Sequence, residues 1–331
     1  MLAGCSTYVQ RAQGVRQANL GGDYEMAATV ALAQAEGSSK DALIWKLEAA
    51  SALRAEGKLA DSAKVLEEVE LMLRAEEERP DFSVSGETVA AFTNDYTSAY
   101  RAKPQDRLYA STYQALNRLE LGQGAAARVA MARLRFVQET FGNGALYVRP
   151  TAKGKVDAKY DVERASQDER TRATLGVVED NLEQIGKDGK YDDAFSHWLQ
   201  GMFFLRLGVD ASDRERARKE LLAATQLNPQ CAAFAADLKE CEGASAVPRV
   251  VYVVIETGLA PEWYEQRVDI PVFVASSNLP YVSIALPALR PSWSDYNLRL
   301  QLEGKDQVVS PASRPDALVA KHFAAALPAV K

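Results

Sequence analysis

The pattern of hydrophobic and polar residues changes from helical to extended close to Pro248. Before that point, from about residue 8 to residue 243, it predicts one helix after another. One of these helices follows a start that resembles a capping box, Ser38-x-x-Asp41. Its expected apolar face consists of Leu43, Ile44, Leu47, Ala50 and Leu53. The first three quarters of the chain are therefore expected to be helical.

The helical part contains an internal repeat. Residues 22–27 (Gly-Asp-Tyr-x-x-Ala) return 35 positions later as residues 57–62 (Gly-Lys-Leu-x-x-Ser), and residues 121–127 carry a third copy. The best copy spans residues 201–229, with Gly and Ala at the positions where two helices would approach closely and Pro at its end. This pattern resembles the tetratricopeptide repeat (TPR), a pair of antiparallel helices repeated about every 34 residues.

Two segments interrupt the repeats. Residues 79–88 form a connection that contains proline and serine, and residues 142–157 form a long polar loop. Loops of this length are uncommon unless they are functional or disordered. We expect the second to be a mobile surface loop.

After Pro248 the pattern indicates extended chain. Short runs rich in β-branched and aromatic residues predict a small sheet of about four strands, which would dock on the helices because a sheet of this size is marginal alone. The predicted strand segments are residues 250–255, 268–270, 272–274, 281–286 and 297–302. Residues 316–327 return to a helical pattern.

The fold class predicted from these patterns is mainly α, an irregular TPR-like helical-hairpin solenoid followed by a small β-rich module. Four parts are expected along the chain. They are residues 1–5, the remnant of a lipoprotein signal; 6–243, the TPR-like repeat domain; 248–305, the β-rich module; and 306–331, a tail with a helix.

The N-terminus carries the second strong motif. Leu2-Ala3-Gly4-Cys5 matches the consensus at which bacteria cleave a lipoprotein signal and acylate the new N-terminal cysteine. Only four residues precede Cys5, so the charged and apolar regions of a working signal are missing. The alternative is a chance match around a buried cysteine. With acyl chains on Cys5 the protein would be membrane-anchored by lipid; expressed without a leader it would be cytosolic.

Composition narrows the class of protein. The chain has 331 residues, of which 47% are hydrophobic and 25% charged, as in ordinary soluble domains. No run of about eighteen apolar residues predicts a membrane span. A net charge of −6 argues against a nucleic-acid partner. Cys231 and Cys241 lie on a predicted helix about 15 Å apart, too far for a disulfide, and are expected to be buried thiols.

Catalytic motifs are missing from the sequence. The two histidines, His197 and His322, are not part of a His-Glu-x-x-His motif, and neither Gly-x-Ser-x-Gly nor a phosphate-binding loop occurs. His197 is expected to be a packed or partly exposed helix residue, and Glu76-Glu77-Glu78 the solvated end of a helix. We predict no enzyme activity, no cofactor and no metal site.

Two surfaces are candidates for binding a partner. Tyr100, Arg101 and Arg107 form a basic and aromatic cluster with Lys103 and Tyr109, and Arg133 lies in a second cluster with Arg128 and Arg135. Paired hydrogen bonds from arginine to an acidic peptide would explain such clusters. The alternative is that these charges are solvated or form local salt bridges.

Trp263 and Tyr264 are the second candidate surface, because they follow the predicted turn Gly-Leu-Ala-Pro at residues 258–261. Aromatic residues on turns often anchor partners. The alternative is that they pack the sheet on the repeats. Trp293 and Tyr296 lie in a second proline-rich connection.

Several segments together resemble an uncharacterised family of bacterial outer-membrane lipoproteins with TPR-like repeats. The resemblance rests on the motif at Cys5, on residues 100–122 with Tyr-Gln-Ala-Leu-Asn, and on residues 253–261 with Glu-x-Gly-Leu-Ala-Pro, followed by Ile270-Pro271 and Leu286-Pro287. It implies a scaffold on the periplasmic side of the outer membrane and no particular reaction. Members of the family continue past Lys331, so we expect both ends of this chain to be incomplete.

The function expected from this resemblance is that of a lipid-anchored periplasmic scaffold, which binds another envelope protein or peptide through a TPR-like groove without catalysis. One alternative is a structural subunit of a larger envelope assembly. The other is a hydrolase acting on peptidoglycan.

Overall fold

The computed structural model describes residues 8–38, 40–79, 99–144, 169–243, 250–258, 260–271, 281–291, 300–307 and 309–330. Cys5, the greater part of both predicted interruptions, the predicted strand at 272–274, and Trp293 and Tyr296 lie outside these residues. Within them the chain is mainly helical, with a few short antiparallel strands, as the sequence predicted. None of the described helices is both long enough and apolar enough to span a membrane.

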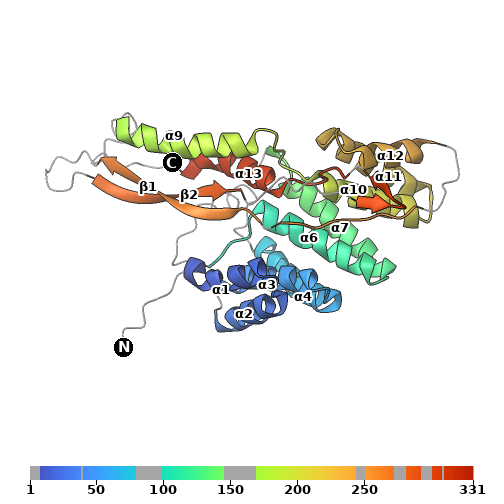
Figure 1. Cartoon of the computed structure of the whole chain (residues 1–331), viewed down its shortest axis with the longest axis horizontal. Helices are drawn as coiled ribbons and strands as arrows, with labels where there is room; N and C mark the ends of the chain where they lie inside the picture. The colour runs from blue at the N-terminus through green and yellow to red at the C-terminus, as the bar shows by residue number, and fades with distance from the viewer. Residues whose placement is uncertain are drawn as a thin grey trace. The chain divides into compact units, whose positions relative to one another are not determined.

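The chain divides into two compact units, one formed by Met1–Tyr147 and the other by Val148–Ala329. Figure 1 shows the elements of each unit. The division lies inside the segment that was expected to be a single repeat domain, whereas the expected boundary was at residues 243–248. The difference arises because β1 and β2 pack on α9, so helices and strands share the second unit.

The first unit is a series of helices, each packed on the next along the chain. They are α1 (Tyr8–Leu20), α2 (Tyr24–Gly37), α3 (Ala42–Ala55), α4 (Leu59–Glu77), α6 (Pro104–Glu120) and α7 (Gly124–Phe141). Its core contains many alanines together with fully buried Trp45, Leu73 and Met131. Alanine favours helix and leaves room for close helix packing.

Three helix pairs in this unit, α1–α2, α3–α4 and α6–α7, are joined by the same turn. Gly22, Gly57 and Gly122 have φ values of 75°, 82° and 69°, a left-handed conformation that favours glycine. The residue after each glycine donates a 2.9 Å backbone hydrogen bond to the carbonyl five positions earlier. This pattern is the Schellman motif. The repeated sequence signal therefore marks a repeated helical hairpin.

Small buried residues hold each hairpin together. Five positions after the turn glycine lie Ala27, Ser62 and Ala127, all fully buried. In the second hairpin the Ser62 hydroxyl donates a 2.7 Å hydrogen bond to the carbonyl of Ala50, so the two helices are in direct contact. Side chains of this size allow the helices to approach closely, as the repeat pattern predicted.

The second unit combines five helices and four strands within the described residues. They are α9 (Glu169–Gly186), α10 (Ala194–Leu207), α11 (Ala211–Leu227), α12 (Ala232–Glu242), β1 (Glu262–Pro271), β2 (Tyr281–Arg290), β3 (Leu300–Leu302), β4 (Lys305–Gln307) and α13 (Pro315–Val330). Helices α10 and α11 pack closely because Gly201 lies against Leu221. The predicted helix at 316–327 is confirmed as part of α13.

The strands differ from the prediction. In the described residues they form two separate antiparallel pairs, β1–β2 and β3–β4, where a single sheet was expected. Glu262 pairs with Arg290 at one end of the β1–β2 hairpin and Pro271 with Tyr281 at the other. The predicted strand at residues 250–255 is wrong, because this segment forms no strand pairing. The hairpin lies along α9 and α13 (Figure 1), which confirms that it docks on helices.

Candidate functional site

Tyr100 and Lys103 form part of the start of α6. The Tyr100 hydroxyl donates a 2.6 Å hydrogen bond to Asp106, whose carboxylate also accepts one from the backbone N–H of Lys103 at 2.8 Å. The Lys103 ammonium lies 4.6 Å from the centre of the Tyr100 ring, and burial lowers the pKa of that lysine. Tyr100 thus contributes to a helix cap, while Arg101 beside it is half-buried.

Arg107 is buried inside the first unit. Its side chain is 1% exposed and donates hydrogen bonds to Glu76 and, at 2.9 Å, to Glu77. The guanidinium also lies 4.9 Å from the centre of the Phe141 ring. This arrangement joins α6 to the C-terminal end of α4 and to α7.

Arg133 pairs with the same acidic end of α4. It donates two hydrogen bonds to Glu77, at 2.8 and 3.0 Å, and one to Glu70 at 3.0 Å. Although burial opposes the charge, the hydrogen bonds to these carboxylates raise the pKa of Arg133. Two arginines from different helices therefore share one group of three glutamates.

These contacts correct two predictions. Arg107 and Arg133 were candidates for an open partner-binding surface, but the structure uses both guanidinium groups in internal ion pairs, which was the alternative. The predicted solvated end of α4 is confirmed for Glu78, which is exposed, but it is wrong for Glu76 and Glu77, whose side chains are only 19% and 14% exposed. Glutamates at a helix C-terminus oppose the helix dipole. The two arginines compensate for that charge.

A second buried network in this unit was not found from the sequence. Arg54 donates a 2.6 Å hydrogen bond to Asn117 and another to Glu120, and Asn117 donates one of 2.9 Å to Ser62. The sequence feature that could have indicated this network is Asn117, in the Tyr-Gln-Ala-Leu-Asn stretch. A polar residue on an apolar helix face needs hydrogen-bond partners when it is buried.

Trp263 and Tyr264 lie on β1, not on the turn that precedes it. The Trp263 ring meets Phe323 of α13 edge to face, with 5.1 Å between ring centres. The guanidinium of Arg290 lies 5.2 Å from the centre of the Tyr264 ring, on the neighbouring strand. Trp263 therefore packs the β1–β2 hairpin on α13. The alternative to partner binding in the sequence analysis was that Trp263 and Tyr264 pack the sheet on the helical repeats.

His197 on α10 bridges two carboxylates. Its ring nitrogens lie 2.9 Å from Asp192 and 2.6 Å from Glu220. Burial alone would favour the neutral ring, but hydrogen bonds to both carboxylates outweigh it and raise the pKa of His197 to about 10. The residue is a permanent cation at neutral pH that ties the start of α10 to α11.

His322 on α13 has the opposite electrostatic environment. It is 1% exposed, and its Nε2 lies 2.7 Å from the backbone carbonyl of Tyr191. Burial lowers the pKa of His322 to about 4. Neither histidine is therefore poised to exchange a proton near neutral pH, as general acid–base catalysis would require.

Tyr252 lies in the segment that was predicted to be a strand, and it is the centre of a polar network. Its hydroxyl accepts a 2.8 Å hydrogen bond from Arg206 and donates one of 2.9 Å to Asp237. Asp237 also accepts a 2.7 Å hydrogen bond from the indole of Trp198, whose ring meets that of Tyr252 edge to face. Burial raises the pKa of Tyr252, so the hydroxyl stays protonated. The network fixes residue 252 against α10 and α12.

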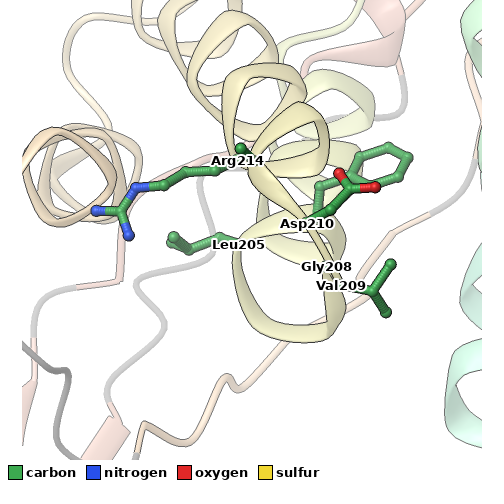
Figure 2. A pocket seen from close by; sticks show the side chains of 7 residues that line it. Leu205, Gly208, Val209, Asp210 and Arg214 are labelled. Carbon is green, nitrogen blue, oxygen red and sulfur yellow. The ribbon is translucent and has the colours of Figure 1, made fainter.

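An open hollow of about 330 Å³ lies at the turn between α10 and α11. Figure 2 shows Asp210 and Val209 on one side of the turn and Arg214 pointing away from them. The Arg214 guanidinium donates hydrogen bonds of 2.9 and 2.6 Å to the carbonyls of Cys241 and Gly243 at the end of α12. The two charged side chains of the hollow thus bind helix ends, because Asp210 accepts a 3.0 Å hydrogen bond from the backbone N–H of Asp213 at the start of α11.

Cys231 and Cys241 are free and buried, as predicted. In the part of the chain that the structure describes, no three His, Cys, Asp or Glu side chains are arranged to hold a metal ion. Comparison of the chain with protein-family models, with curated proteins and with solved structures finds no match.

Proposed function

We propose that this chain is a lipid-anchored periplasmic scaffold at the outer membrane, which binds another cell-envelope protein through a TPR-like groove and has no catalytic activity. In this proposal the hairpins of the first unit stack as an irregular TPR-like solenoid. The Leu-Ala-Gly-Cys motif at Cys5 supports the anchor, and the resemblance to outer-membrane lipoproteins supports the location.

The observation that carries the proposal is the hairpin that occurs three times with one turn. Helical repeats contact only their neighbours, so equivalent positions form a continuous surface suited to an extended partner. Nine residues before the turn glycines lie Gln13, Glu48 and Tyr113, which are exposed or half-buried. Thirteen residues before the glycines of the second and third hairpins lie Ile44 and Tyr109, also half-buried. These positions on the first helices define the proposed groove.

The groove offers aromatic and polar contacts in place of the predicted arginines. Tyr109 and Tyr113 combine an apolar ring with a hydroxyl, which is the chemistry that protein interfaces favour. Arg107 and Arg133 would act only indirectly, by holding α6 and α7 in place.

Site-specific photo-crosslinking in the native envelope tests this surface. A photoreactive amino acid at Glu48 or Tyr109 should capture one envelope protein. The matched positions are Leu71 on α4 and Val129 on α7, which are second helices with 67% and 68% exposure. Equal capture from those positions, or release of cell-wall fragments by the protein, would contradict the groove.

Salt added before irradiation separates the proposed groove from a permanent subunit contact. A complex that dissociates at high salt fits a transient groove, and a stoichiometric complex that resists salt fits a structural subunit. The anchor is tested separately by expressing the chain behind a bacterial lipoprotein signal peptide. Fatty-acid labelling should reach the mature protein and be lost in Cys5→Ser, whereas persistent labelling of that variant would exclude Cys5 as the anchor.

A further inference from the structure

Residues 250–255 present an unpaired apolar edge. Within the described residues this segment lies outside every helix and strand and makes no backbone–backbone hydrogen bond. Five of its six side chains are β-branched and exposed. The exposed fractions are 43% for Val250, 86% for Val251, 56% for Val253, 41% for Val254 and 41% for Ile255.

Tyr252 is the inward-facing residue of the segment. It is half-buried through its contacts with Trp198, Arg206 and Asp237, whereas Val251 and Val253 on either side are the two most exposed positions. This alternation is the two-residue period of an extended chain. The segment is therefore held in place on α10 and α12 through Tyr252, while its five apolar side chains are exposed to solvent.

An exposed apolar strand with free N–H and C=O groups is a template for another strand. Because Tyr252 already fixes this segment, little further ordering is needed for it to accept one. The sequence itself indicates which strand fits. Val250-Val251-Tyr252-Val253-Val254 reads the same in both directions, so an antiparallel copy centred on Tyr252 places a valine opposite every valine.

Charge favours the same antiparallel arrangement. Glu256 follows the apolar run and is exposed. A parallel pair in register would place the two Glu256 side chains beside each other. The antiparallel pair separates them by eight residue spacings, roughly 27 Å at about 3.4 Å per residue.

We propose that residues 250–255 pair with the same segment of a second copy of this chain, which forms a two-fold symmetric dimer. In this pair Val251 of one copy lies opposite Val253 of the other, as an isologous interface requires. A six-residue strand buries less than the roughly 800 Å² per partner of a standard interface, so the dimer is weak and depends on concentration.

Sedimentation velocity over a wide range of concentrations tests this dimer. The full chain should pass reversibly from monomer to dimer. A V251K/V253K variant places lysine opposite lysine twice and should remain monomeric. Val209→Lys is the matched control, because Val209 is 82% exposed in the same unit but lies at the α10–α11 turn. It should dimerise like the unmodified chain, and thermal unfolding should be unchanged in both variants.

Charge exchange tests the register. A V251E/V253E variant should also be monomeric alone, but an equal mixture with V251K/V253K should form a heterodimer, because each lysine then faces a glutamate. A chain that is monomeric at every concentration would overturn the proposal, and residues 250–255 would then be a candidate binding edge for a different protein. A dimer that V251K/V253K does not weaken, or a mixture that fails to associate, would also overturn the proposal.

Discussion

The buried guanidinium of Arg107 and the carboxylate of Glu77 form a 2.9 Å ion pair that links α6 to the last turn of α4. These helices are separated in the sequence by residues 78–103, so the pair closes a long connection. Glu76 and Glu77 depend on Arg107 and Arg133 for compensation of their charge. The Arg107–Glu77 pair therefore has a structural role. Arg107 was a candidate for partner binding, and its burial predicts that its replacement lowers the stability of the protein.

Arg107→Met should destabilise the first unit strongly. Removing one partner of a buried ion pair costs about 3–5 kcal/mol, and in this variant Arg133 alone of the two arginines would remain paired with Glu77. Urea unfolding followed by circular dichroism measures the change. Arg135→Met is the matched control, because Arg135 is 53% exposed and its ion pair with Glu139 lies along its own helix. Its midpoint should hardly change. Equal effects of the two substitutions would contradict the buried role of Arg107.

Local signals along the sequence predicted the hairpins well. Gly22, Gly57 and Gly122 mark their turns because the left-handed conformation is local and favours glycine. Small residues such as Ala27 and Ala127 mark the helix contacts because the spacing is fixed by the turn. Each of these features depends on a few neighbouring residues, so it can be predicted without knowing the rest of the fold.

The candidate site could not be predicted in the same way. Whether Arg107 faces solvent or a glutamate depends on how α4 and α6 meet, and no local pattern contains that information. Likewise, residues 250–255 have the composition of a strand, but pairing requires a neighbour at the right place. The hydroxyl of Tyr252 is held by Arg206 and Asp237 from two helices, which fixes the segment without a sheet.

Two glycines inside helices should respond to alanine in opposite ways. At Gly201 an added Cβ would lie 2.6 Å from Cγ of Leu221, so Gly201→Ala should destabilise the second unit by about 1–3 kcal/mol through overpacking. At Gly176 nothing lies within 4 Å, and Gly176→Ala should stabilise by about 0.5–1 kcal/mol through helix propensity. Thermal unfolding of both variants measures the signs. A Gly201→Ala variant that is as stable as the unmodified protein, or more stable, would show that α10 and α11 do not meet at Gly201.

His322 should make the protein sensitive to mild acid. Its pKa is about 4 in the folded state and 6.5 in the reference state, so the unfolded chain binds the proton first. The stability from the neutral ring is present above pH 6.5 and is lost as the pH falls toward 4. His322→Phe removes this titration while keeping a ring against Tyr191, and should flatten the fall in unfolding free energy between these values. An unchanged slope would assign the acid sensitivity to other groups.

His197 should act in the opposite pH range. Its pKa is about 10 when folded and 6.5 in the reference state, so the folded protein holds the proton more tightly. The stability from the imidazolium is fully present below pH 6.5 and declines as the pH rises to 10. His197→Gln should therefore cost more stability at pH 6 than at pH 10, measured by urea unfolding at each pH.

The two carboxylates provide the control for this prediction. Asp192→Asn removes one of the hydrogen-bonded charges that raise the pKa of His197 and leaves Glu220 in place. The pKa of His197 should then fall from about 10 toward its ordinary value of 6.5, which NMR titration of the two imidazoles can follow. An imidazole that already titrates near 6.5 in the unmodified protein, with His322 assigned by its own variant, would show that the bridge does not form. A pKa near 10 that falls in the variant would identify Asp192 as one of the charges that hold the proton on His197 and tie the start of α10 to α11.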